Sequence, residues 1–522
     1  MLFSFNQINF TKQLQKEILS CEIDLTIYSM RNWIREGTII MSGQKKMSLF
    51  GLIGITMAFF GTVRSVPTLS ITGWTQIFYM LVAAVLFALP IALMSAELST
   101  GFPEEGGPQV WAKNALGEKW GFVTSWLLWV QMFFGMVMVA STVGVLFGYV
   151  INKPELSTNN YFIFAVILIS YWGVTLLNLK FDMVKIAGNW GAVIGVYIPF
   201  VLLVVLGVIY MIKNGIQPQS YLGNFKASDL VPNFKDLGSL TYLSGIIFIF
   251  AGVEISSVHA NNIENPKRNY PVAVITSVIL LVIFNIVAGL TVSNAVPMGE
   301  LQLANITQPY LIFCENLGIP SIFVNLVSLM IMIGVLVQLS AWVLGPSKSM
   351  IKVADEGNLP KFFQKRNKKD IPITFVMIQA IVISLVSFLY VVVPDVNSAF
   401  LIITITTTIL YCVVYALIAI SAIRLRYKMP DVKRPFRLGS KGNGLMWFVS
   451  LLSMISVIIT ITVSLIPPSI LEPSQYTGYI IYQIVATVVM IGIALIINKC
   501  KKPEWKKEAS ADQTKVSVKK AY

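Results

Sequence analysis

The chain has 522 residues, of which 56% are hydrophobic and only 12% charged, and its formal net charge is +14. Because ordinary soluble domains contain roughly 25% charged residues, this composition excludes a soluble domain and indicates an integral membrane protein. The sequence has one histidine, four scattered cysteines and no HExxH, phosphate-loop or GxSxG motif. We therefore expect no metal, no other cofactor, no catalytic residues and no enzymatic activity.

The first forty residues precede the apolar body of the chain. They carry no secretory signal with a small-residue cleavage site, and "MSGQKKMSLF" from Met41 resembles an ordinary start just ahead of the first apolar run. We expect Met41 to be the physiological initiator. Residues 1–46 are the predicted cytoplasmic N-terminal segment, and the alternative is that the first forty residues form a cytoplasmic regulatory arm.

A membrane-spanning helix needs about 20 mostly apolar residues, and the chain contains twelve such runs. We therefore predict an all-α, polytopic membrane protein. The predicted spans are 47–71, 75–98, 121–151, 160–178, 189–213, 239–260, 272–295, 321–349, 372–393, 398–424, 443–467 and 476–498.

The first span, "GITMAFFGTVRSVPTLSITG", is interrupted by Gly61, Arg64 and Pro67. Glycine and proline both weaken a helix, and a broken helix survives in a membrane only against a cavity or a buried partner. A guanidinium there costs several kcal/mol even on the lenient insertion scale, so Arg64 is a candidate functional residue. Its alternative role is a structural ion pair.

The sixth span has a similar weak point, where Gly252 is followed by Glu254. Interrupted spans in corresponding positions of two halves indicate an inverted-repeat transporter. We expect a 5+5 inverted repeat with discontinuous first and sixth helices. Its repeats would be 47–213 and 239–424, followed by two added helices in 443–498 and a basic cytoplasmic tail, 499–522.

The basic residues indicate topology. Of the 39 lysines and arginines, 34 fall on the side of both termini and four on the opposite side, with Arg64 inside a span. Excess positive charge marks the cytoplasmic side and favours contact with anionic lipids. We expect cytoplasmic termini, a multi-pass location in a cell membrane and a lipid bilayer, not nucleic acid, as partner. The sequence fixes no oligomeric state.

Several motifs resemble those of the amino acid–polyamine–organocation transporters, especially the bacterial glutamate/GABA antiporters. The resemblance covers about residues 47–470, with the LeuT-like fold that it implies. The motifs are "FPEEGGPQVWAKNALGEKWGF" (102–122), "GVEISSVHANNIENPKRNYP" (252–271), "LSAWVLGPSKSM" (339–350), "GNLPKFFQKRNKKDIPITF" (357–375) and "PDVKRPFRLGSKGNG" (430–444).

The resemblance implies that the main chain of both interruptions meets the amino and carboxylate groups of the substrate, and that other spans supply the walls. Two positions depart from the antiporters: Arg64-Ser65 replaces an aromatic-acidic pair, and Gln338 replaces an acidic residue. Both changes make the site less negative and favour a more anionic substrate. The expected binding residues are Gly61, Arg64, Ser65, Gln131, Phe250, Gly252, Glu254, Gln338, Trp342 and Tyr411.

Two residues are candidates for proton binding or pH sensing. Glu254 is a carboxylate in an apolar run, and its alternative role is packing within span six. His259 is the alternative sensor, although an interfacial histidine is commonly structural. We further expect a salt bridge between Arg64 and Glu254 that substrate competes for.

The predicted function is secondary transport of amino acids by alternating access, in the glutamate/GABA exchange mode. Small amino acids are the expected partners, and no nucleotide-binding motif supplies energy. The alternatives are a proton-coupled amino acid symporter of different specificity and, from another class, a membrane amino acid sensor or a channel.

Overall fold

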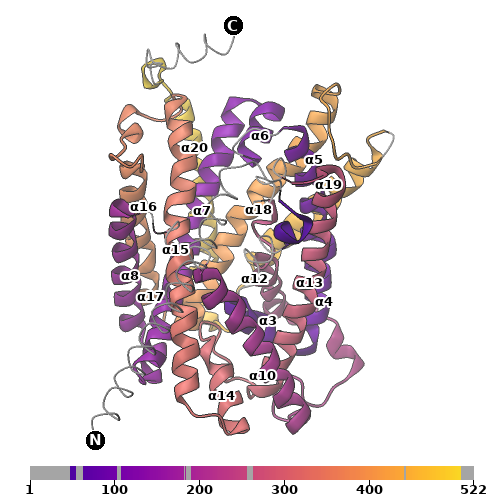
Figure 1. Ribbon diagram of the computed structural model, residues 1–522, viewed down its shortest axis with the longest axis vertical. Helices are drawn as coiled ribbons and strands as arrows, with labels where there is room; N and C mark the ends of the chain where they lie inside the picture. Colours follow the sequence, from indigo (N-terminus) through magenta and orange to yellow (C-terminus); the bar gives the residue numbers. More distant parts are fainter. Residues whose placement is uncertain are drawn as a thin grey trace, which may run out of the picture.

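The computed structural model describes residues 47–53, 63–102, 107–181, 183, 190–254, 263–439 and 442–506. These residues form helices, turns and two isolated β-bridges, without an extended strand. The long helices run roughly parallel to one another between the two ends of the molecule (Figure 1). The all-helical class predicted from composition is confirmed.

Ten helical segments of the described chain are long and apolar enough to cross a membrane. They correspond to the predicted spans two to five and seven to twelve. They are α4–α5 (Gln76–Val82 and Leu89–Gly101), α7 (Glu118–Val150), α8 (Asn160–Lys180), α10 (Ile198–Asn214, extended to Trp190), α13 (Pro266–Ala295), α15 (Ile322–Asp355), α16–α17 (Ile373–Ser387 and Leu389–Val392), α18 (Val396–Lys428), α19 (Gly444–Ser464) and α20 (Tyr476–Lys499).

Shorter helices connect these spans near the two ends of the molecule. α6 (Pro108–Leu116) precedes α7, and α11 (Leu237–Leu240) leads into the sixth span. α14 (Thr307–Leu317) lies between α13 and α15.

The described parts of spans one and six include short helices, and the one in span six ends at an interruption. In span six, α12 (Tyr242–Phe248) stops before Gly252, which has a positive φ of 99°. A left-handed conformation of this kind favours glycine because a Cβ would clash with the main chain. In span one, a 3₁₀ turn (Val63–Ser65) precedes α3 (Val66–Ser70).

Pro67 lies in the first turn of α3, where a missing N–H group leaves no hydrogen bond unmade. Its position is therefore compatible with the start of α3. The interruption predicted near residues 61–67 stays a prediction, because the described residues 63–70 continue from the 3₁₀ turn directly into α3. Gly61 lies outside the described residues.

Spans one and six contact each other through α3 and α12, and the turn that follows span six contacts the start of span one. A Cβ built on Gly245 of α12 would lie 2.7 Å from Thr68 Cγ2, so α3 and α12 approach closely there. At the other end, the Glu264 N–H donates a 3.1 Å hydrogen bond to the Met47 carbonyl. Spans one and six are thus arranged as a pair.

Helices α7, α8, α15 and α16 form a second unit, joined by buried side-chain hydrogen bonds. The amide of Gln379 accepts from Trp129 Nε1 (3.0 Å) and donates to Tyr171 Oη (2.7 Å). Asn178 and Ser340 exchange two more bonds, of 2.7 and 3.2 Å. Such interhelical bonds hold membrane helices together where apolar contact alone gives little preference. This unit is called the scaffold below.

A buried ion pair fixes the loop between α18 and α19. Arg426 donates to both carboxylate oxygens of Glu97, at 2.8 and 2.5 Å, and the Leu438 N–H adds a third bond of 2.7 Å. Both side chains are at most 2% exposed. The sequence analysis missed this pair because its partners are more than 300 residues apart.

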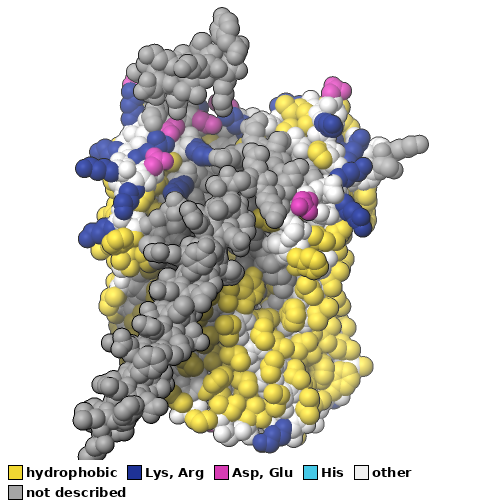
Figure 2. Space-filling model, viewed as in Figure 1, with side chains coloured by type: hydrophobic (Ala, Val, Ile, Leu, Met, Phe, Trp, Pro, Cys, Tyr) yellow, Lys and Arg dark blue, Asp and Glu magenta, His cyan; other side chains and the backbone are white. Residues whose placement is uncertain are grey.

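The surface is divided as a membrane protein requires. Figure 2 shows a broad hydrophobic band and Lys and Arg side chains concentrated at one end of the molecule, with few at the other. The hydrophobic band includes exposed lipid-compatible side chains such as Leu176, Ile283 and Ile458. Exposed apolar side chains are unfavourable in water, but they have no such free-energy cost where they face the hydrocarbon of a membrane.

Candidate functional site

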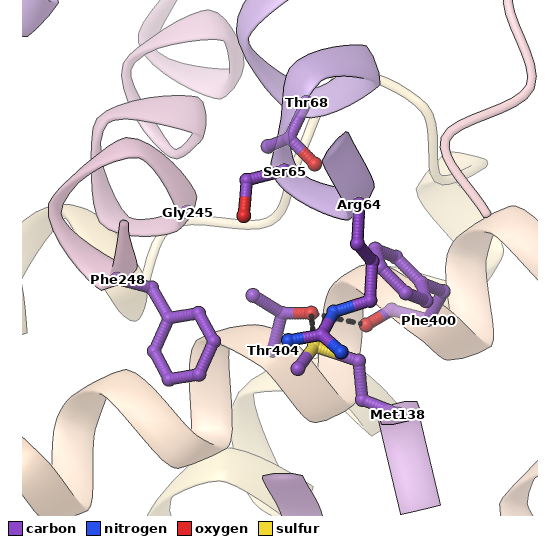
Figure 3. Close-up of a pocket in the computed structure, with 8 residues that line it drawn as sticks. All are labelled: Arg64, Ser65, Thr68, Met138, Gly245, Phe248, Phe400 and Thr404. Carbon is purple, nitrogen blue, oxygen red and sulfur yellow. Dashed lines mark hydrogen bonds between the residues drawn. The ribbon is translucent and has the colours of Figure 1, made fainter. Parts of the chain in front are cut away.

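Arg64 lies in the 3₁₀ turn that begins the described part of span one, and it points into a pocket. The pocket contains about 10 Å³ of open space, room for about one water molecule. Figure 3 shows the guanidinium beside Phe400 and Met138, facing Phe248 across the pocket. The remaining lining residues are Ser65, Thr68, Gly245 and Thr404. An amino acid could enter only after these side chains separate.

The guanidinium is hydrogen-bonded to a neutral partner. Its Nη1 donates a 3.2 Å bond to Gln338 Oε1 in α15, and Arg64 is only 7% exposed. No other hydrogen bond or salt bridge joins it to the described residues. A guanidinium has five N–H donors, and a buried charge without a compensating partner is strongly unfavourable. The arrangement can therefore receive an anionic group.

The predicted Arg64–Glu254 salt bridge is wrong. Glu254 Oε2 instead accepts a 2.8 Å hydrogen bond from Tyr415 Oη, and no pairing within 4.0 Å links Glu254 to Arg64. The reason is that Tyr415 in α18 holds the carboxylate, whereas Arg64 extends toward α15. The Arg64 guanidinium and the Glu254 carboxylate therefore do not neutralise each other.

Tyr415 also binds the main chain of the span-six interruption. Its hydroxyl accepts a 2.6 Å hydrogen bond from the Gly252 N–H, while Glu254 Oε1 is buried and has no hydrogen-bond partner among the described residues. The ring stacks on Tyr411 with centroids 5.5 Å apart. The sequence analysis missed Tyr415, although its position one turn after Tyr411 indicates the same helix face.

The remaining predicted wall residues gather near the middle of α7, α15 and α18. A Cβ on Gly135 would lie 3.4 Å from the ring of Trp342 and 3.7 Å from Thr407 Cγ2, so these three residues meet. Gln131, one turn before Gly135, lies next to Tyr411 and has a buried Oε1 with no partner among the described residues.

The two groups of residues lie close together along the same helices. Gln338, which binds Arg64, is one turn from Trp342 on α15. Phe250 is buried in the span-six interruption, and Ser65 lines the Arg64 pocket. Among the predicted residues, Gly61 and His259 lie outside the described residues.

The family model described as amino acid permease matches residues 46–507. The chain belongs to the amino acid permease family. The permease is therefore an amino acid transporter of the membrane and not an enzyme, as expected from the sequence.

The permease is similar in sequence to two known transporters and in fold to one solved structure. It is 33% identical over 468 residues to the glutamate/gamma-aminobutyrate antiporter of Lactococcus lactis subsp. lactis (strain IL1403), covering 87% of this chain and 90% of that one. It is 28% identical over 428 residues to an uncharacterized transporter of Legionella pneumophila, covering 82% and 90%.

The crystal structure of MhsT in complex with L-phenylalanine superposes with a TM-score of 0.55 at 14% identity, covering 81% of this chain and 99% of MhsT. The permease therefore has the LeuT-type fold that the resemblance implied. Among the described residues ten spans are long enough to cross a membrane, and α3 and α12 lie in the other two predicted runs, parts of which are outside the described residues.

Proposed function

We propose that this permease exchanges amino acids across a bacterial inner membrane and accepts anionic amino acids of the glutamate type, with GABA as a counter-substrate. The proposal rests on Arg64, a buried guanidinium whose hydrogen-bond partner among the described residues is the neutral amide of Gln338. The Lactococcus relative, a glutamate/gamma-aminobutyrate antiporter, supports the same substrate pair.

In this proposal Arg64 binds a substrate carboxylate. A guanidinium offers parallel N–H groups that match the two oxygens of a carboxylate, a geometry that lysine cannot reproduce. Ser65 and the main chain of Gly61 and of Phe250–Glu254 would hold the remaining polar groups of the amino acid. Gln131, Gln338, Trp342 and Tyr411 would form its walls.

Alternating access would arise from motion between the two units of the fold. Spans one and six are paired with each other, and the scaffold is joined by its own buried hydrogen bonds. The Arg64–Gln338 bond crosses between these units. A substrate carboxylate that competes for Arg64 would weaken this hydrogen bond between the units. It would thereby change the relative stability of the outward-open and inward-open states.

The proposed orientation places both termini on the cytoplasmic side of the membrane. Lys and Arg side chains gather at one end of the molecule (Figure 2), which favours placing this end, and both termini, in the cytoplasm. The proposed repeats are residues 47–213 and 239–424.

Glu254 is the preferred proton-binding candidate because one of its buried oxygens has no hydrogen-bond partner among the described residues. His259 is the alternative.

Counterflow in proteoliposomes tests the proposal. Labelled glutamate is supplied outside, and unlabelled glutamate, GABA or no amino acid inside, at two pH values. We expect uptake that requires an internal amino acid and that GABA stimulates. Absence of glutamate uptake under every condition would contradict the proposed substrate.

Variants of Arg64 test its role in the same assay. Loss of a charge-assisted hydrogen bond costs about 1.5–3 kcal/mol, so Arg64→Lys should raise the KM for glutamate by roughly ten-fold or more. Arg424→Lys, at an exposed arginine, is the matched control. A wild-type KM in Arg64→Lys would rule out two-point carboxylate recognition.

A further inference from the structure

The loop between α15 and α16 folds against the end of α8. Asn367 Nδ2 donates a 3.1 Å hydrogen bond to the Leu179 carbonyl, and Lys369 Nζ contacts the Lys180 carbonyl. The same ammonium lies 5.6 Å from the centroid of the Phe181 ring. These contacts bring two basic segments, far apart in sequence, to one place at the edge of the scaffold.

This place, called the basic rim below, presents five exposed lysines. Within the described residues, none of the five forms a salt bridge. The nearby acidic groups are engaged elsewhere, since Asp355 and Asp370 pair with Arg366 and Glu356 pairs with Lys113. The five lysines are Lys180, Lys361, Lys365, Lys368 and Lys369.

The following segment does not cancel this charge. Residues 182–189 contain one acidic and one basic side chain, Asp182 and Lys185, and so add no net charge. The basic rim therefore keeps a local excess of about five positive charges, which attracts anions at the surface.

Apolar side chains accompany the lysines and place the basic rim at the boundary of the membrane. Phe181 and Phe362 are 50% and 48% exposed, and Leu176 and Leu177 of α8 are exposed on the adjoining turn. Figure 2 shows Lys and Arg directly above hydrophobic surface at the upper left, where α8 and α16 lie in Figure 1. Lysine and aromatic side chains together are typical of the headgroup level of a bilayer.

We propose that the basic rim binds the phosphate headgroups of anionic phospholipids. The lysines supply charge for the phosphate, while Phe181, Phe362 and the α8 leucines contact the acyl chains next to it. A soluble anion such as inorganic phosphate has no acyl chain, so these apolar side chains would add nothing to its binding free energy. A bound lipid would connect the end of α8 with the loop that joins α15 to α16, and so brace the scaffold that carries Gln338. This inference does not depend on which substrate is transported.

The test compares two lipids added to the purified full-length protein in detergent micelles. Phosphatidylglycerol and phosphatidylcholine differ in headgroup charge, and thermal unfolding is recorded over a titration of each. We expect phosphatidylglycerol to raise the Tm more than phosphatidylcholine. The extra shift should fall as NaCl is added, because salt screens exposed charges.

A triple variant identifies the place of binding. Lys361→Gln/Lys365→Gln/Lys368→Gln removes three charges from the basic rim, and these exposed side chains form no salt bridge with the described residues. Each nearby lysine contributes about 1 kcal/mol to binding an anionic surface, so the apparent affinity for phosphatidylglycerol should fall at least about ten-fold.

The matched control, Lys153→Gln/Lys226→Gln/Lys235→Gln, removes three exposed lysines from the opposite side of the predicted membrane. It should retain the wild-type response. Wild-type affinity for phosphatidylglycerol in the basic-rim variant would overturn the proposal. An equal Tm shift from inorganic phosphate at the same concentration would also overturn it, because the apolar contact would then contribute nothing.

Discussion

Tyr415 in α18 donates a 2.8 Å hydrogen bond to Glu254 at the interruption of span six. The same hydroxyl accepts the Gly252 N–H, so a single side chain holds both the carboxylate and the main chain of the interruption. A free N–H and a carboxylate are costly in a buried environment unless they are paired. Tyr415 therefore makes this irregular main chain possible inside the molecule.

Tyr415→Phe should destabilise the permease and slow exchange. The change leaves two buried polar groups without this partner, and an unsatisfied buried group costs about 1–3 kcal/mol. Thermal unfolding and proteoliposome counterflow measure the two effects. Tyr390→Phe is the matched control because Tyr390 Oη is buried without a hydrogen-bond partner among the described residues. Equal Tm losses in both variants would contradict the role given to Tyr415.

Gln338→Glu should weaken recognition of anionic substrates. A carboxylate at this position, within 3.2 Å of Arg64 Nη1 in the present side-chain arrangement, would pair with the guanidinium and compete with the substrate. An internal pair of this kind is worth about 1.5–3 kcal/mol, which predicts a KM for glutamate raised by roughly ten-fold or more.

Gln338→Met is the companion variant for this measurement, since it removes the acceptor without adding charge. It should leave the KM for glutamate unchanged or lower it. If both variants raise the KM equally, the loss of the glutamine, and not the added charge, is responsible.

Glu97→Gln should strongly destabilise the protein. Removing one partner of a buried ion pair leaves an uncompensated charge and typically costs about 3–5 kcal/mol. Thermal unfolding in detergent measures the loss. Glu118→Gln is the control, since Glu118 pairs with Lys501 at 3.4 Å on the surface and such pairs contribute about 0–1 kcal/mol. A Tm for Glu97→Gln close to that of the control would contradict the importance of the pair.

Gly334→Ala should disrupt the crossing of span five and α15. A Cβ on Gly334 would lie 2.5 Å from Gly195 Cα, a distance that requires the two main chains to separate. Overpacking of a buried contact costs about 1–3 kcal/mol. The measurement is the Tm and the yield of monodisperse protein.

Gly345→Ala is the control in the same helix because open space surrounds Gly345. It should be neutral or slightly stabilising, since alanine has the higher helix propensity. Similar losses in the two variants would show that helix propensity, and not the close crossing, decides the outcome.

The sequence by itself determined the number and order of apolar segments, because a spanning helix must carry about 20 apolar residues wherever it is placed. It also located the interruption of span six, since glycine and charge within an apolar run are unfavourable in an unbroken helix. Arg64 was recognised from its residue type, and Gln338 from its departure from the antiporters that the chain resembles. Their hydrogen bond, however, joins residues 274 positions apart.

Only the tertiary structure decided which polar groups meet. Glu254 and Arg64 were expected to pair because their charges are opposite, yet Tyr415 holds the glutamate and Gln338 receives the arginine. Likewise, Glu97 lies in an ordinary apolar sequence until folding places Arg426 beside it. The physical reason is that hydrogen bonds and ion pairs act over a few ångströms, so side-chain pairing depends on how helices far apart in sequence cross.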